Sequence, residues 1–117
     1  ANIPVGEVKP ASEALTLDLG EARMLKGFTY APIYKGEGGC IVAYDLEASV
    51  DGSVWTKVYE GKMFENIINN PTSREVMFDA PLKAKALRLT PVRVEISAGA
   101  AGQEHDTYGV SEFSAVE

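Results

Sequence analysis

Several stretches of the sequence alternate strictly between apolar and polar residues, and this period-two pattern constrains the fold more than any other feature. In residues 15–19 leucines alternate with Thr16 and Asp18, and in residues 44–50 Tyr, Leu, Ala and Val alternate with Asp, Glu and Ser. Residues 86–96 show the same alternation. Because successive side chains of a β-strand point to opposite faces of a sheet, each stretch predicts a strand with one buried face.

Further short apolar runs, at residues 24–31, 55–59, 74–81 and 109–116, predict the remaining strands. Asp51-Gly52 predicts a tight hairpin turn before the strand that holds Trp55, because both residue types tolerate positive φ. Pro81 is expected to end one strand, and Pro91 predicts a bulge, a bend or an edge position. About eight short strands without a sustained helical period predict an all-β fold, a β-sandwich or jelly roll.

The length of 117 residues indicates a single domain. Residues 1–13 hold two prolines and are expected to form a linker or extended lead-in, with the β-sandwich domain spanning residues 14–117.

The charge balance and the residue inventory exclude several classes of function. Eleven Lys and Arg against seventeen Asp and Glu give a net charge of −6, which argues against a nucleic-acid-binding surface and against an anionic membrane surface. One Cys and one His cannot form an internal disulfide or a Cys/His zinc cluster. No apolar run reaches the roughly 20 residues of a membrane span, and the first residues contain no signal-peptide core. No paired base and nucleophile is present, so we do not expect an enzyme.

Five motifs occur in a fixed order: LTLDLG, GFTYAP, YDLEASVDGSVW, ALRLTP and SEF. Together they resemble the coagulation factor 5/8 type C, or discoidin, domain. The variety that they resemble is the family 32 carbohydrate-binding module, which is appended to bacterial glycoside hydrolases such as chitobiases and fucosidases. The resemblance covers about residues 14–117 and implies a galactose-binding-domain-like jelly roll.

The resemblance also implies a function. It indicates a non-catalytic carbohydrate-binding module that is attached to a secreted glycoside hydrolase and binds glycan weakly through loops at one end of the sandwich. The partner is then a glycan, or the catalytic domain of the same polypeptide, and the isolated domain is expected to be a monomer. The location is secreted, periplasmic or at the cell surface. The alternative is a structural accessory domain that packs against the catalytic domain and binds no sugar.

Two departures from the family pattern bear on ligands. In the family, an N-terminal motif supplies much of a structural calcium site, and this motif is not evident here. Glu112 alone matches that site. We therefore expect no cofactor, although the resemblance leaves calcium possible. Calcium needs about six to eight oxygen ligands. Ile33 and Gly38 stand where sugar-binding members often carry Arg and Asn.

Sugar recognition needs aromatic faces and planar polar side chains. If the family topology holds, residues 32–39 and 98–109 lie at the same end of the sandwich and form a shallow cleft. We expect Trp55 to pack against the sandwich, and Asn69 and Asn70 to form a turn. The predicted ligand-binding residues are Tyr34, Gln103, His105, Asp106 and Tyr108.

Overall fold

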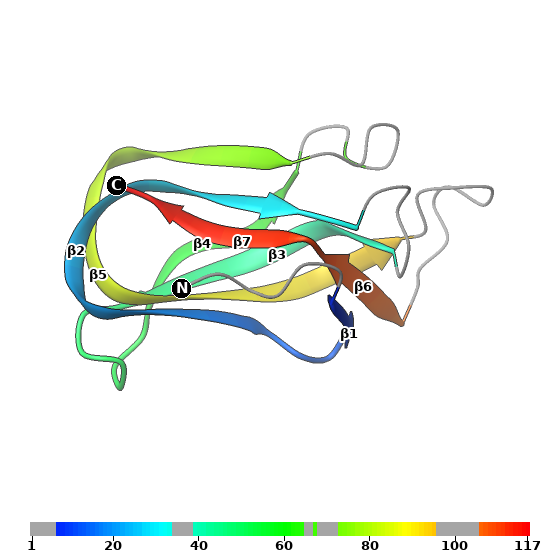
Figure 1. Cartoon of the computed structure of the whole chain (residues 1–117), viewed down its shortest axis with the longest axis horizontal. Helices are drawn as coiled ribbons and strands as arrows, with labels where there is room; N and C mark the ends of the chain where they lie inside the picture. The colour runs from blue at the N-terminus through cyan, green and yellow to red at the C-terminus, as the bar shows by residue number, and fades with distance from the viewer. Residues whose placement is uncertain (1–6, 34–38, 65–66, 68–72, 96–105) are drawn as a thin grey trace.

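The computed structural model describes residues 7–33, 39–64, 67, 73–95 and 106–117. These residues form seven strands and no helix, which confirms the all-β prediction (Figure 1). The strands are β1 (Glu7–Pro10), β2 (Leu15–Ala31), β3 (Cys40–Ser49), β4 (Thr56–Met63), β5 (Arg74–Glu95), β6 (Thr107–Val110) and β7 (Glu112–Val116).

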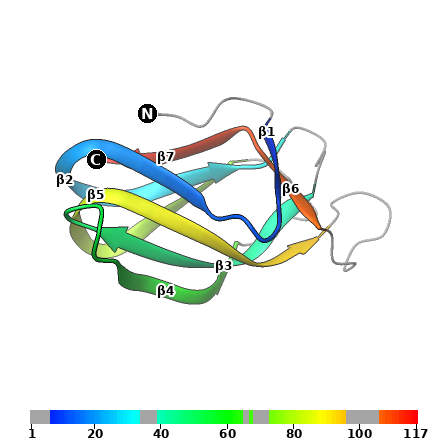
Figure 2. The same cartoon turned by 90° about the horizontal axis from the view of Figure 1, so that it is seen from below.

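Two long bent strands, β2 and β5, join the two layers of a β-sandwich. β2 and β5 pair with each other on both sides of the bends, so β4-β3-β5-β2-β7 is one antiparallel sheet folded over on itself. One layer contains β4, β3, the second half of β5 and the first half of β2. The other contains the first half of β5, the second half of β2, and β7. Both views show β2 and β5 turning together at one end of the molecule (Figures 1 and 2).

The bend in β2 explains why the sequence suggests two strands where there is one. Gly20 has φ of 85°, a conformation that L side chains rarely adopt, and its amide donates to the Asp18 carboxylate at 2.8 Å. Pairing with β5 is interrupted between Asp18 and Arg23. Pro81 lies in β5 at the second register shift of this pairing, between Met77 and Leu82, and does not end that strand, which corrects the prediction of two separate strands there.

The alternating residues form the core between the layers. Leu15 and Leu17 of β2, Tyr44, Leu46 and Ala48 of β3, and Leu87 and Leu89 of β5 are all buried. At Pro91 the pairing of β3 with β5 is shifted, because Tyr44 lies opposite Pro91 and Ala43 opposite Arg93. Val92 is the extra residue, and it is exposed. The bulge that was one of the options for Pro91 is therefore confirmed.

Two connections differ from the prediction. The turn between β3 and β4 spans residues 50–55 and is not a two-residue hairpin, so Val50 leaves the buried face and is exposed. The expected final strand is divided at Ser111 into β6 and β7.

The expected lead-in also contributes to the domain. Residues 7–10 form β1, which pairs with β6 in a separate two-stranded sheet. In the described residues, then, this part of the lead-in is a strand and not a free linker. Nowhere in the described part of the chain is there a helix long and apolar enough to cross a membrane.

Candidate functional site

The predicted site lies at the end of the sandwich opposite the bends, which we call the loop end. It is defined by the described residues that flank three connections: Ile33, Gly39, Phe64, Ser73, Glu95 and Asp106. The Gly109 amide donates to the Gly39 carbonyl oxygen at 3.0 Å, and Cys40 pairs with Glu95. The flanks of residues 34–38 and 96–105 therefore lie together, as the family topology predicts.

A buried tyrosine holds these flanks in place. The Tyr30 hydroxyl donates to the Gly109 carbonyl oxygen at 2.8 Å and accepts from the Ile41 amide at 3.4 Å. Burial raises the pKa of Tyr30, which keeps its hydroxyl protonated as a donor. Nearby, the Ser111 hydroxyl donates to the Pro32 carbonyl oxygen at 2.8 Å. The end of β2, the start of β3 and β6 thus form one rigid support for the loops.

Tyr108 belongs to this support and does not present an exposed ring. It has no exposed surface, and its hydroxyl donates to the Glu13 carbonyl oxygen at 2.7 Å. The reason is that the residue, which looks like part of a polar loop, lies in β6, which pairs with β1, and its ring belongs to the core cluster. This corrects the expectation of a tyrosine face available for stacking on a sugar.

Among the other predicted site residues, only Asp106 is described. It is exposed directly before β6, and its carbonyl oxygen accepts from the Ala11 amide at 2.8 Å, so its backbone is fixed while its side chain faces solvent. Tyr34, Gln103 and His105 lie outside the described residues, as do Asn69 and Asn70. Their role in binding stays a prediction.

A pocket of about 270 Å³ adjoins the loop end between the end of β4 and the start of β5. The buried Phe64 ring stacks on Tyr30 and Tyr44, with centroids 5.1 and 4.4 Å apart. No local sequence pattern indicates this pocket, because its residues come from β4 and β5, two strands that are not neighbours in the sheet. The lining residues are Lys62, Met63, Phe64, Arg74, Glu75 and Val76.

The described residues do not assemble a metal site. No group of three or more His, Cys, Asp or Glu in this part of the chain is placed to hold a metal ion. The Glu112 carboxylate, which matches the family's calcium position, accepts from the Ser114 hydroxyl at 2.8 Å. One carboxylate engaged in this way does not supply the set of oxygen ligands that calcium requires.

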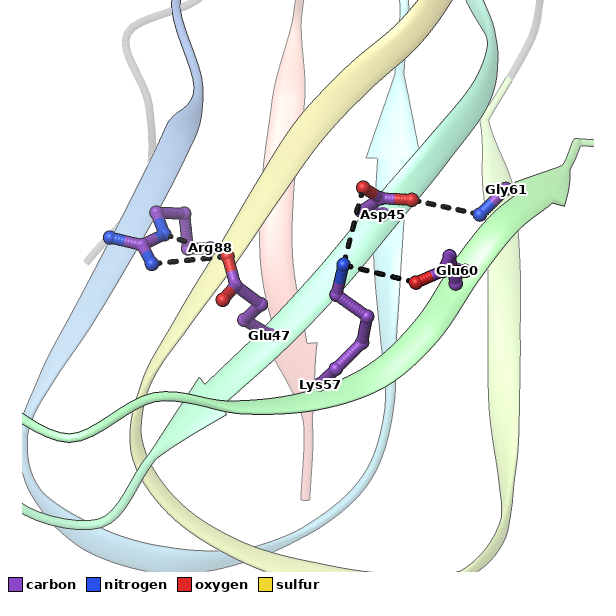
Figure 3. A network of polar contacts seen from close by, with 6 residues as sticks. All are labelled: Asp45, Glu47, Lys57, Glu60, Gly61 and Arg88. Carbon is purple, nitrogen blue, oxygen red and sulfur yellow. Dashed lines mark hydrogen bonds and ion pairs between the residues drawn. The ribbon is translucent and has the colours of Figure 1, made fainter.

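The outer face of the layer containing β3 carries a charged network (Figure 3). Arg88 binds Glu47 with Nη2 at 3.0 Å, and Lys57 lies 3.6 Å from Asp45 and 3.4 Å from Glu60.

Trp55 lies beside this network and is half-buried. The guanidinium of Arg88 covers its ring, with Cζ 4.2 Å from the centroid. Trp55 therefore packs against the sandwich as expected.

Comparison with known proteins shows the family. The F5/8 type C domain model matches residues 5–105, so the chain belongs to the F5/8 type C domain family. Its fold is that of family 32 carbohydrate-binding modules.

The relatives are a curated protein and two solved structures. Pig lactadherin is 33% identical over 88 residues, which is 70% of this chain and 22% of lactadherin, so the chain spans about a fifth of this relative. The family 32 carbohydrate-binding module of Clostridium perfringens NanJ, solved in complex with galactose, is similar with a TM-score of 0.66 and 24% identity, over 93% of this chain and 68% of that one. A glycoside hydrolase 29 family member from a rumen bacterium is 29% identical with a TM-score of 0.62, over 92% of this chain and 19% of that one.

Proposed function

We propose that this domain is a non-catalytic module that binds glycan weakly through its loop end. The observation that carries the proposal is the set of hydrogen bonds from Tyr30 and Gly109 that brings the flanks of residues 34–38 and 96–105 together. A rigid support under two adjacent loops allows side chains from both to contact one ligand without ordering the whole site on binding.

The chemistry of the predicted residues fits a sugar. Tyr34 offers an aromatic ring, and Gln103, His105 and Asp106 offer hydrogen-bond donors and acceptors for hydroxyl groups. Binding is weak because each sugar hydroxyl exchanges bonds with water for bonds with protein at little net gain. Tyr108 supports the backbone of this site and does not touch the ligand.

The proposal extends to the whole protein. The similarity to a glycoside hydrolase of which the chain covers 19% supports a domain attached to a secreted glycoside hydrolase. The module would keep the catalytic domain near its glycan. The isolated domain would be a monomer and would act outside the cell or at its surface.

Amide chemical shifts recorded during titration with galactose, N-acetylgalactosamine, N-acetylglucosamine and fucose test the proposal. We expect clustered shifts at Ile33, Gly39 and Asp106 and in the adjoining loops. His105→Ala and Asp106→Ala should weaken binding, whereas Lys26→Ala, on the exposed surface of the bend in β2, should not. Unchanged affinity in both site variants, or shifts centred away from the loop end, would contradict the proposed site.

The alternative is a structural accessory domain without sugar binding. Ile33 at the position where sugar-binding members often carry Arg favours it. A structural accessory domain should show no change in amide chemical shifts with any of the four sugars, or with larger glycans added to the panel.

A further inference from the structure

A pocket at the opposite end of the sandwich has no role in the proposed function. It has a volume of about 380 Å³, within the range of ligand pockets, and lies where β3 ends, β4 begins and β5 bends. We call it the bend-end pocket. Figure 1 shows the residue 50–55 connection beside the bends of β2 and β5, far from the loop end. The lining residues are Ala48, Val50, Asp51, Val54, Thr56, Lys57, Val58, Leu82 and Lys83.

Two valines at this pocket are exposed although the backbone that carries them is fixed. Val50 is 55% exposed and Val54 is 70% exposed. The Asp51 carboxylate accepts from the Ser53 and Val54 amides at 2.8 and 2.9 Å, and from the Ser49 hydroxyl at 3.1 Å. Apolar side chains held in place at a concave surface form a site that needs little reorganisation on binding.

The charges at the rim of the pocket favour an acidic partner. Asp51 is the only acidic residue among the described residues that line the pocket, and its carboxylate is occupied by the three donors within its own turn. Lys57 is held by Asp45 and Glu60 (Figure 3). Lys83 is exposed and forms no ion pair with any residue that the structure describes. The pocket therefore offers an available ammonium group beside an apolar surface.

The strand that borders the pocket can also pair with a partner. β4 lies at the edge of the folded sheet and pairs only with β3 among the described strands. Thr56, Lys57 and Val58 line the pocket, so the free edge begins beside it. The pairing of β3 with β4 is shifted at Val58 and again near Glu60 and Gly61, and these bulges limit the usable edge to the first two residues of β4, Thr56 and Lys57.

We propose that the bend-end pocket binds an extended protein segment in which one large apolar side chain is flanked by Asp or Glu. The apolar side chain would contact Val50, Val54, Val58 and Leu82, and a flanking carboxylate would pair with Lys83. The backbone of the segment would hydrogen-bond to the edge of β4, as in recognition by strand addition. The site is independent of the loop end and does not rest on sugar binding.

Three blocked pentapeptides test this in titrations of the full chain that follow amide and methyl chemical shifts. The first has a central leucine between two acidic residues on each side, the second replaces that leucine with serine, and the third replaces the acidic residues with lysine. We expect the first to shift Val50, Val54, Val58 and Leu82. The serine peptide should bind at least about tenfold more weakly, because the apolar burial of leucine is lost.

Reversing the charge of Lys83 provides a second test of the proposal. Lys83→Glu should weaken binding of the acidic leucine peptide about fivefold and strengthen binding of the lysine peptide, because the charge at the rim of the pocket has changed sign. Lys62→Glu, an equal charge change on the exposed surface of β4 beside the loop end, should leave both affinities unchanged, and the amide spectrum of each variant reports that it is folded.

Several results would overturn the proposal: no shift with the acidic leucine peptide, equal affinity for the serine peptide, or shifts outside the pocket. Tighter binding of decanoate than of any peptide would show a site for small amphiphilic anions. Concentration-dependent shifts at the pocket without peptide would show that a second copy of the chain covers it.

Discussion

The Tyr30 hydroxyl and the Gly109 carbonyl oxygen form a hydrogen bond of 2.8 Å between residues 79 positions apart in the chain. This contact joins β2 to β6 beneath the loop end. Both residues are buried, so neither group can exchange its partner for water. The bond links the order of the candidate site to the stability of the core.

Tyr30→Phe should therefore lower the free energy of unfolding by about 1–3 kcal/mol, since it leaves the buried Gly109 carbonyl oxygen without this donor. The Ile41 amide loses its acceptor as well. Urea unfolding followed by fluorescence measures the change. A loss below about 0.5 kcal/mol, the size of an ordinary surface substitution, would mean that water replaces the hydroxyl.

Tyr44→Phe is the matched control, and we expect the opposite result. The Tyr44 hydroxyl is buried and has no hydrogen-bond partner among the residues that the structure describes, while its ring stacks on Phe64 and meets Phe28 edge-on. Phenylalanine keeps both ring contacts and removes an unsatisfied polar group. The variant should be as stable as the parent chain or up to about 1 kcal/mol more stable in the same urea experiment. Marked destabilisation would show that the hydroxyl has a partner in solution.

The same two tyrosines predict a loss of stability at alkaline pH. Burial raises the pKa of Tyr30 and of Tyr44 above the ordinary value of about 10, so the unfolded chain loses these protons first. The contribution of these two tyrosines to the free energy of unfolding is complete below about pH 10. It is lost as the pH rises toward the pKa that each tyrosine has in the folded chain. Each contributes a slope of up to about 1.4 kcal/mol per pH unit.

Comparing the parent chain with Tyr44→Phe above pH 10 isolates this effect, because other groups titrate equally in both. The stability of the variant should fall less steeply, by about 1.4 kcal/mol per pH unit. Parallel curves would mean that Tyr44 ionises as easily when folded as when unfolded.

Local periodicity was sufficient to predict most of the core. Leu15, Leu17, Tyr44, Leu46 and Leu89 are buried as their alternation indicates, since burial on one face of a strand depends on nearest neighbours in the sequence. The bends in β2 and β5 were not predictable in this way, because the alternation breaks where the strand passes from one layer to the other.

The candidate site was less predictable, because it depends on contacts between distant segments. Tyr108 lies in a polar stretch of sequence but is buried in the core, in a strand that pairs with β1, and its hydroxyl binds the Glu13 carbonyl oxygen; both partners come from a segment expected to be a lead-in. The position of the loop flanks follows from Tyr30 and Gly109, a pairing that no local pattern indicates. The family topology was what predicted the shared end.

Gly27 is a position in the sheet where an added side chain would overlap backbone atoms. It lies in β2 between Met77 of β5 and Val116 of β7. A Cβ atom there would overlap the Val76 carbonyl oxygen and lie 3.0 Å from the Met77 Cα, both of which belong to the backbone of a paired strand. Gly27→Ala should therefore cost about 3 kcal/mol of unfolding free energy, because the strands must move apart.

Gly61→Ala is the comparison for this substitution. Gly61 has φ of 63° and nothing within 4 Å of an added Cβ, so alanine there should cost only about 1 kcal/mol, from backbone strain alone. Urea unfolding of both variants measures the difference. Equal losses at the two positions would show that β2 and β5 separate easily at Gly27, and that the folded-over sheet is looser there than its pairing indicates.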